Sequence, residues 1–332
     1  MLILGKIELK EKVEQSALNK VKHQIRKNTI IAYDLTDINK NAARKMEKLS
    51  VVFDGSKRES ANGYTLHGLG VNGILLKLEV HEGAENTQNQ LRKKIVEKYA
   101  QEFHQKGIWV FDRGNDDKAF FKYLRHEQKV QFIARLRLNR GIVVKETGAI
   151  LNVEKLPVGR YQVYLMNKQN TYVDLRAEFT LIISKHLDEE KQPIRLLASL
   201  LHTYSSEEVV DMYLQRWGIE NIFKRGKQKF NLEKIRVLNY QKFVNLIALI
   251  QFAINVSTVT FIKIQRSTYS LISGVLIYYK KFLKLKALTF NLDSFISFMK
   301  VSLKPLIHEA KKLPPKQLSL LSRRNLEKLG PF

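Results

Sequence analysis

Two short apolar runs in the first third of the chain each end at an aspartate. Residues 30–33 are apolar over the length of a buried strand, and Asp34 follows them directly. Residues 107–111 form a second run of this kind, which Asp112 follows. Open α/β sheets carry their chemistry at the carboxyl ends of such strands. The pattern predicts an α/β protein and makes Asp34 and Asp112 candidate site residues.

Residues 63–80 predict two strands joined by a glycine-rich turn. Gly68, Gly70 and Gly73 formally match a dinucleotide-binding fingerprint. A strand follows these glycines, however, so no helix N-terminus is available for a pyrophosphate. Hairpin glycines are the better interpretation.

One helix is predicted before the first strand, at residues 9–27, and two more between later strands, at residues 86–106 and about 116–125. Asp116 and Asp117 stand where a cap of the last of these helices would lie. A further buried strand, residues 131–137, carries basic residues at its end.

The segment from 141 to 199 has a different pattern. Short β-rich runs alternate there with turns rich in Gly, Asn and acidic residues. We expect a β-domain inserted into the core and set beside it, apart from the central sheet. Asp112 and Glu220 flank this insertion in the sequence.

Residues 205–230 have the features of a helix with one charged face. Ser205 and Glu208 stand at capping-box spacing at its start. The helical period places Tyr213, Arg216, Glu220, Lys224 and Lys227 on one face, with Trp217 at its edge. A solvated face with a Glu220–Lys224 pair is one interpretation. One acid among bases, next to an aromatic ring, favours a nucleic-acid surface instead; Trp217 would stack on a base there or belong to the core.

Residues 243–262 carry no charge over 20 positions. Their length is sufficient to span a membrane, which is one interpretation. Asn, Gln, Ser and Thr interrupt the run, and no other segment indicates a membrane. A core helix beneath the sheet is therefore the preferred interpretation.

The chain is strongly basic, with a formal net charge of +25. Residues 221–332 hold 21 Lys and Arg but only 4 Asp and Glu, so the charge is concentrated in the C-terminal third. This predicts an anionic partner, although a basic surface alone also fits RNA or a membrane surface. The absence of Cys excludes disulfides and Cys-ligated zinc. An N-terminus that becomes charged after a few residues is unlike a signal peptide, so we expect a cytoplasmic protein.

The spacing Tyr213-x2-Arg216-x3-Glu220-x6-Lys227 matches the Tyr-Arg-Glu-Lys signature of bacterial insertion-sequence transposases. Residues 111–124 also resemble the segment that carries the second aspartate of this family. The resemblance covers residues 29–265 and implies a DDE enzyme with a ribonuclease-H-like core. Family members carry a helical DNA-binding domain before the first aspartate, and 33 residues precede Asp34 here.

The resemblance implies that Asp34, Asp112 and Glu220 form a catalytic, metal-binding site. Three carboxylates repel one another without a cation, and hard oxygen ligands favour Mg²⁺, with Mn²⁺ as a substitute. Two such ions can activate a water or a 3′-OH and stabilise the leaving oxygen at phosphorus. DNA-binding roles are expected for the neighbouring side chains, which are Tyr213, Arg216, Trp217, Lys224 and Lys227.

The implied function is that of a DNA transposase, which hydrolyses phosphodiester bonds and transfers strands at insertion-sequence ends. A ribonuclease-H-like DNA nuclease without strand transfer and a non-catalytic DNA-binding remnant are the alternatives. The expected partners are transposon-end and target DNA, with the chain a homodimer on DNA, associated with the nucleoid and not with a membrane.

The expected architecture is α/β, a ribonuclease-H-like mixed-sheet core with an inserted β-rich domain and a helical basic C-terminal region. The predicted parts are an N-terminal helical remnant (1–28), the two halves of the catalytic core (29–140 and 200–266), the inserted β-domain (141–199) and the C-terminal region (267–332).

We predict electrostatic DNA binding carried mainly by the C-terminal third. The logarithm of the association constant should fall by about 0.9 per phosphate contact for each unit of log salt. Deleting residues beyond about 270 should flatten this slope, as measured by fluorescence anisotropy at several salt concentrations. Binding that ignores salt would contradict the nucleic-acid interpretation.

Overall fold

The computed structural model describes residues 8–40, 43–54, 59–82, 86–166, 173–188, 190–267, 291–297 and 299. The chain divides into two units, Met1–Val256 and Ser257–Phe332. The predicted C-terminal helices lie mostly outside the described residues.

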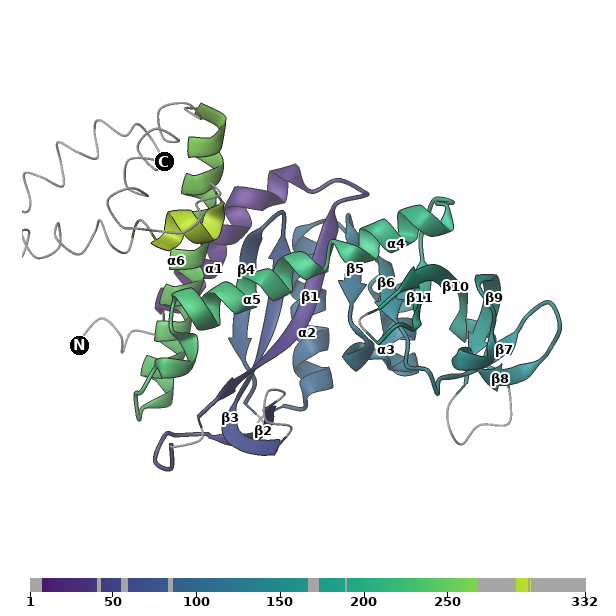
Figure 1. The fold of residues 1–332 in the computed structure, drawn as a ribbon, viewed down its shortest axis with the longest axis horizontal. Coiled ribbons are helices and arrows are strands. Elements are labelled where there is room, and N and C mark those ends of the chain that lie inside the picture. Colours follow the sequence, from purple (N-terminus) through teal and green to yellow (C-terminus); the bar gives the residue numbers. More distant parts are fainter. Residues whose placement is uncertain are drawn as a thin grey trace, which may run out of the picture. The chain divides into compact units, whose positions relative to one another are not determined.

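A mixed sheet forms the centre of the first unit (Figure 1). Its core strands are β1 (Ile30–Asn39), β3 (Glu59–Val71), β4 (Ile74–Val80), β5 (Ile108–Phe111) and β6 (Gln131–Arg135), and β2 (Ser50–Asp54) pairs with β3 at the edge. The core order is β4-β3-β1-β5-β6, with β3 antiparallel to β1 while β5 and β6 run parallel to it. This is the predicted ribonuclease-H-like mixed sheet, and the predicted α/β class is confirmed.

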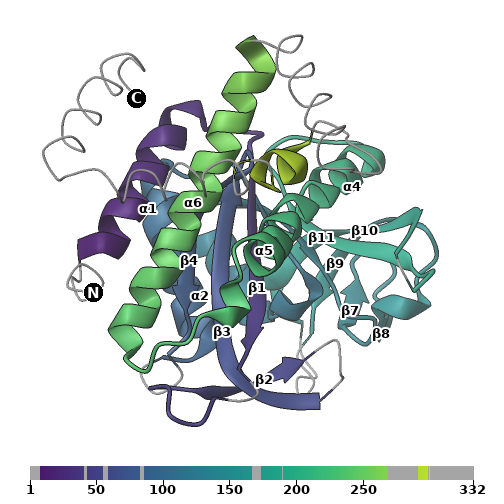
Figure 2. The same cartoon turned by 60° about the vertical axis from the view of Figure 1, so that its left-hand side comes forward.

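Helices cover both faces of this sheet (Figure 2). The helices α5 (Trp217–Lys229) and α6 (Tyr240–Ser267) pack their apolar side chains on the face that carries Ala32 and Leu66. On the other side lie α1 (Glu8–Val21) and α2 (Gln88–Glu102). The short helix α3 (Lys118–Lys122) follows Asp112.

Gly68 and Gly73, two of the glycines in the fingerprint-like spacing, have different roles. Gly73 has φ +79° beside Asn72 at φ +50°, which makes the Asn-Gly turn of the β3–β4 hairpin. Gly68 lies instead within β3, beneath α5, where a Cβ would come within 2.3 Å of the Phe223 ring. The hairpin explanation therefore holds for Gly73, while Gly68 allows α5 to approach the sheet.

The inserted segment is rich in strands, but it does not form a separate sheet. Its strands are β7 (Gly141–Val144), β8 (Ile150–Asn152), β9 (Gly159–Leu165), β10 (Glu178–Leu187) and β11 (Pro193–Ser199). β11 pairs antiparallel with β6, so the sheet continues from the core into the insertion. The expectation that the insertion lies apart from the central sheet is wrong, because β6 would otherwise be an open edge. The division of the chain at residues 140 and 199 stays a prediction.

Polar side chains of α6 bond to the backbone of β4. The register of β3 and β4 shifts between Leu69 and Gly70, which disturbs the ladder near Leu75. Asn255 accepts from the Leu75 N–H at 2.8 Å and donates to its carbonyl at 2.8 Å. Gln251 donates to the carbonyls of Leu75 and Leu76 at 3.0 and 2.9 Å. Residues 240–263 could cross a membrane by length and composition, but these bonds are those of a helix packed on a sheet.

We expect Asn255→Ala and Gln251→Ala to lower the free energy of unfolding. Asn255→Ala leaves the buried Leu75 N–H without this acceptor, which costs about 1–3 kcal/mol. Gln251→Ala removes only a hydrogen bond, which costs about 0.5–1.5 kcal/mol, because Asn255 and Tyr99 still donate to the Leu75 and Leu76 carbonyls. Asn221→Ala and Gln228→Ala, at exposed positions of α5, are the matched controls. Urea unfolding followed by circular dichroism measures the difference, and equal stability of the two pairs would contradict the assigned role of α6.

Candidate active site

Asp34 and Asp112 lie on neighbouring parallel strands. Tyr33 of β1 is opposite Phe111 of β5, so the two aspartates come next to each other at the point where β5 ends. The prediction that Asp34 ends its own strand is wrong, since β1 continues to Asn39 in its pairing with β3. Asp34 therefore has a rigid strand position, while Asp112 begins the loop that leads to α3.

The predicted helix from 205 to 230 is two helices. Helix α4 (Ser206–Leu214) starts with the predicted capping box, in which Ser205 accepts from the Glu208 N–H at 3.1 Å and Glu208 accepts from the Ser205 N–H at 2.7 Å. The α-helical hydrogen bonding is interrupted at Gln215 and Arg216, although both residues keep right-handed helical dihedrals, and α5 begins at Trp217. Hydrogen bonds of the 3₁₀ type tighten this turn; in one of them the Arg216 N–H donates to the Tyr213 carbonyl at 3.0 Å.

The predicted stripe is only partly exposed. Tyr213 and Arg216 are buried, at 2% and 4% exposure, whereas Trp217 and Glu220 face solvent. The expectation of one continuous exposed stripe is therefore wrong. Arg216 instead points towards the aspartates of the sheet.

The Arg216 guanidinium joins all three candidate carboxylates. One nitrogen, Nη1, lies 2.7 Å from Asp34 Oδ2, and Nη2 lies 2.7 Å from Glu220 Oε1 and 3.8 Å from Asp112 Oδ1. Tyr213 adds a hydrogen bond from its hydroxyl to Asp112 Oδ1 at 3.3 Å. Residues from β1, the end of β5 and α5 thus meet at one cation.

Burial dominates the electrostatics of this cluster. It raises the pKa of the Asp34 carboxyl to about 7, with Arg216 opposing the rise and the neighbouring Asp112 and Glu220 adding to it. Burial alone would lower the pKa of Arg216, but Tyr213 and the three acids hold it above its ordinary value. The arginine is therefore always charged. Its charge offsets the repulsion that three neighbouring acids would otherwise cause.

The donor set fits a hard divalent cation. Three carboxylates with no sulfur ligand are the ligand type that Mg²⁺ and Mn²⁺ prefer. In the described part of the chain and in its present conformation, no three His, Asp or Glu residues lie close enough together to share one ion. The present contacts of these carboxylates go to Arg216, so a cation would be bound in exchange for part of them.

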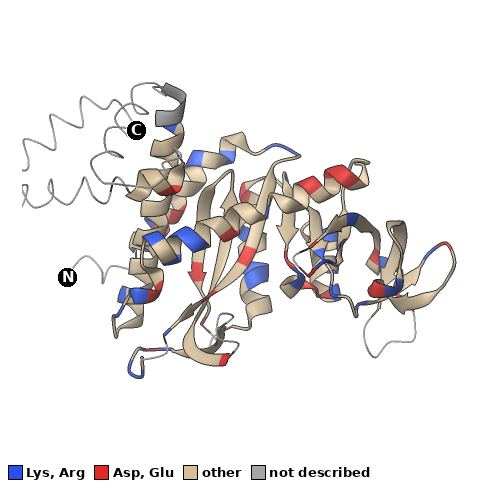
Figure 3. Ribbon diagram, in the orientation of Figure 1, with Lys and Arg blue, Asp and Glu red and all other residues tan. Residues whose placement is uncertain are grey.

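The remaining predicted DNA-binding residues lie along α5, whose last turn is basic (Figure 3). The side chain of Trp217 is 51% exposed, which excludes the core role. Lys224 is also exposed. Lys227 is partly buried and lies 3.5 Å from Glu233. Trp217 and Lys224 are thus available to a ligand at the surface, and Lys227 would first give up its ion pair.

Asp116 is a residue whose role the sequence does not reveal. Asp117 caps α3 as predicted, by accepting from Ala119 and Phe120 N–H groups. Asp116 is not a cap, because its buried carboxylate accepts from the Arg137 N–H at 2.9 Å and pairs with Arg140 at 2.6 Å. It therefore fixes the loop after Asp112 to the segment between β6 and β7. Nothing in two adjacent aspartates distinguishes one from the other.

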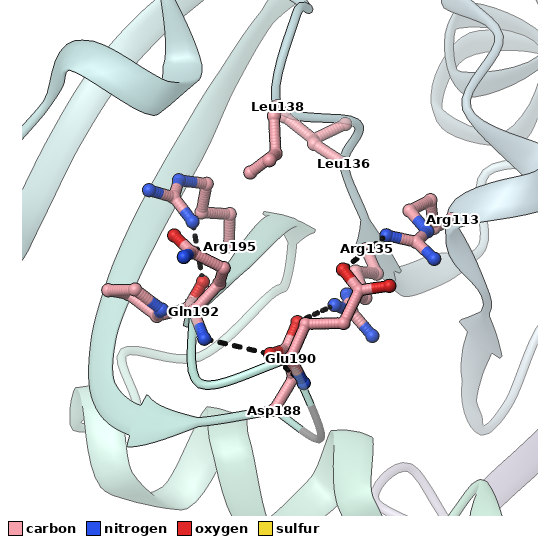
Figure 4. Close-up of a pocket in the computed structure, with 9 residues that line it drawn as sticks. Arg113, Arg135, Leu136, Leu138, Asp188, Glu190, Gln192 and Arg195 are labelled. Atoms are coloured by element: carbon pink, nitrogen blue, oxygen red, sulfur yellow. Dashed lines mark hydrogen bonds and ion pairs between the residues drawn. The ribbon is translucent and has the colours of Figure 1, made fainter.

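A second charged group holds the insertion beside Asp112 (Figure 4). Arg135 at the end of β6 pairs with Asp188, and Arg113 lies 3.6 Å from Glu190. The acids belong to the turn between β10 and β11, and the arginines belong to the core. These ion pairs place the insertion next to the loop that carries Asp112.

The family profile described as Transposase DDE domain matches residues 25–256. The chain belongs to this family. No curated protein matches the chain. Among solved structures it is similar to the crystal structure of A. aeolicus Argonaute, with 13% identity and a TM-score of 0.22, over 57% of this chain and 24% of that one. A TM-score this low supports no conclusion about the transposase chain.

We expect Arg216→Gln to destabilise this transposase domain in EDTA and divalent ions to restore part of the loss. Removing one partner of a buried ion pair costs about 3–5 kcal/mol, here because the three carboxylates would face one another without a cation. Thermal unfolding with and without Mg²⁺ measures both effects, and Mg²⁺ should stabilise the variant more than the parent. Arg44→Gln, at an exposed arginine, is the control. An equal response of variant and parent to Mg²⁺ would contradict this role.

Proposed function

We propose that this chain is a DNA transposase whose catalytic residues are Asp34, Asp112 and Glu220. The family membership supports transposase function in general. The observation that carries the specific site is the convergence of these carboxylates on Arg216, with each within 4 Å of its guanidinium nitrogens. Three acids from separate elements are gathered in this way where a cation is to be bound.

The proposed metal is Mg²⁺, with Mn²⁺ as a substitute, held as two ions by these three carboxylates. Bound there, the ions would activate a water or a 3′-OH and stabilise the leaving oxygen of a phosphodiester. The side chains of Glu220 and Asp112 are 48% and 35% exposed, while that of Asp34 is 13% exposed. A phosphate therefore approaches from the side of Glu220 and Asp112, with Asp34 beneath.

The surrounding side chains position the DNA in this proposal. Lys224 lies one turn beyond Glu220 and supplies a point charge for a phosphate, and the exposed ring of Trp217 supplies a stacking surface. Tyr213 and Arg216 orient the carboxylates in the conformation described here. Their contacts to phosphate require that they exchange these partners for DNA.

The proposed substrates are insertion-sequence ends and target DNA, bound by a homodimer in the cytoplasm at the nucleoid. Cleavage and joining would follow at the same three carboxylates, without a covalent protein–DNA intermediate. A nuclease that cuts without joining and an inactive DNA-binding remnant are the alternative outcomes of the tests below.

Glu220→Gln should separate binding from chemistry. The parent carboxylate repels a polyanion in EDTA, so the affinity of the variant for DNA should hold or rise slightly. Its nicking of DNA in Mg²⁺ should fall by more than about a hundredfold, because one of three metal ligands is lost. Asp34→Ala and Asp112→Ala should behave in the same way. Nicking at the parent rate would show that Glu220 belongs only to a solvated helix face.

Lys227→Ala supplies the opposite control for this comparison. It should weaken DNA binding and reduce the salt slope by about one phosphate contact, with a smaller effect on nicking. Incubation with 3′-OH-ended DNA then tests strand transfer. Joined products indicate a transposase, nicks without joining indicate a nuclease, and neither product indicates a remnant.

A further inference from the structure

A second basic surface lies away from the three carboxylates. It is a hollow of about 630 Å³ between the turn that follows α1 and the loop that follows α2. Its lining consists of four Lys or Arg side chains, one Glu, two His and three uncharged residues: Lys22, Arg26, Lys98, Lys106, Glu102, His23, His104, Gln101, Ile25 and Phe103. The proposed function makes no use of these residues.

Most of the positive charge in this hollow is uncompensated. Among the residues that the structure describes, no acidic side chain forms an ion pair with Lys22, Arg26 or Lys106. Within the described part of the chain, the Arg26 guanidinium donates only to the backbone carbonyls of His23 and Ile25, at 3.0 and 3.5 Å. Lys98 lies 3.4 Å from Glu14, but its side chain remains 51% exposed. Cations without acidic partners are available to an anionic ligand.

The loop that forms one wall is fixed by the cap that ends α2. His104 and Gln105 both have positive φ, at +51° and +56°, a backbone conformation that residues other than glycine adopt infrequently. Gly107 follows at φ +93°, and a Cβ there would come within 2.5 Å of the Ile31 side chain. The loop is thereby fixed tightly against the start of β1. The His104 and Gln105 N–H groups donate to the Gln101 and Ala100 carbonyls, which is the usual left-handed cap of a helix C-terminus, so this wall of the hollow has a defined shape.

The hollow and the carboxylates lie at different ends of the core strands. The two segments that line the hollow lead directly into β1 at Ile30 and β5 at Ile108. Asp34 lies four residues further along β1, about 13 Å at the rise of a strand, and Asp112 follows the other end of β5. The hollow and the carboxylates therefore lie at opposite ends of these strands.

We propose that this hollow binds the phosphate backbone of duplex DNA, at a segment separate from the one that is cut. The proposal rests on the proposed function in taking DNA as the ligand. Its four Lys and Arg side chains line a space of about 630 Å³, which is much larger than one small anion needs and suits a chain of phosphates. Phe103 and Ile25 are 1% and 2% exposed, so the floor offers no stacking surface. The surface therefore recognises backbone and not base sequence.

Removing the unpaired cations tests the proposal. The triple variant Lys22→Ala, Arg26→Ala, Lys106→Ala should flatten the plot of log affinity against log salt by about 2–3 units, at roughly 0.9 per phosphate contact. The control variant Lys155→Ala, Lys185→Ala, Lys191→Ala removes the same charge from exposed positions of the insertion. Equal slopes for the two variants would overturn the proposal.

Stability distinguishes binding from a purely structural role. If these cations only offset the negative end of the α2 dipole, the triple variant would unfold at lower temperature and keep the parent salt slope. We expect the reverse, an unchanged unfolding temperature with a flatter slope. Inorganic phosphate at millimolar concentration should not compete with DNA for the hollow. Competition by phosphate alone would indicate a small-anion site and overturn the duplex assignment.

Cross-linking locates the DNA segment independently of catalysis. The chain has no Cys, so a single introduced cysteine carries a photoactivatable cross-linker at one place. Gln101→Cys places it in the hollow, Asn221→Cys places it beside Glu220, and Val51→Cys, on the exposed edge strand β2, measures background. The first two should label different nucleotides of one end-labelled duplex.

The outcomes separate this proposal from the proposed function. Labelling from residue 101 no stronger than from residue 51, or at the nucleotides labelled from residue 221, would overturn the separate segment. Strong and distinct labelling without any nicking in Mg²⁺ would leave the hollow as a DNA-binding surface and reject the catalytic role of the carboxylates.

Discussion

The contact of one guanidinium with three carboxylates is the interaction on which the rest of the candidate site depends. Asp34 comes from a central strand, Asp112 from the end of its neighbour and Glu220 from a helix on the sheet face. Mutual repulsion opposes the gathering of three acids, and Arg216 supplies the attraction that offsets it. The missing side chain at Gly68 serves the same end, because it lets α5 pack closely enough on β3 for Glu220 to reach the cluster.

Local signals in the sequence predicted much of this arrangement. Four predicted features depend on neighbours within a few positions, and each is observed: the strand at residues 30–33, which continues through Asp34, the strand that ends before Asp112, the capping box at Ser205 and the cap at Asp117. The helical period correctly placed Arg216 beside Tyr213 and Glu220, but it did not show that Tyr213 and Arg216 are buried. The break at Gln215 and Arg216 accompanies tertiary contacts with distant aspartates, which no local pattern records.

The same distinction explains the errors about the insertion and about Asp116. Alternating residues identify strands in 141–199, but they do not identify the neighbour of a strand, and the pairing of β11 with β6 joins segments about sixty positions apart. The partner of Asp116 is Arg140, beyond β6 in the sequence, whereas its neighbour Asp117 caps its own helix and also contacts Asn89 and Arg92 of α2. The two aspartates are adjacent and have the same local sequence, but their tertiary contacts differ, and those contacts decide their roles.

The pairing of β6 with β11 also determines how separable the insertion is from the core. Arg135, where the chain leaves the core, is the strand partner of Leu196, where it returns. The two ends of the insertion are thus neighbours in space, and a loop of almost any length can join neighbouring points, since closure entropy grows only slowly with loop length. This part of the gene can gain, lose or exchange sequence over evolution while the strands beneath the three carboxylates keep their positions.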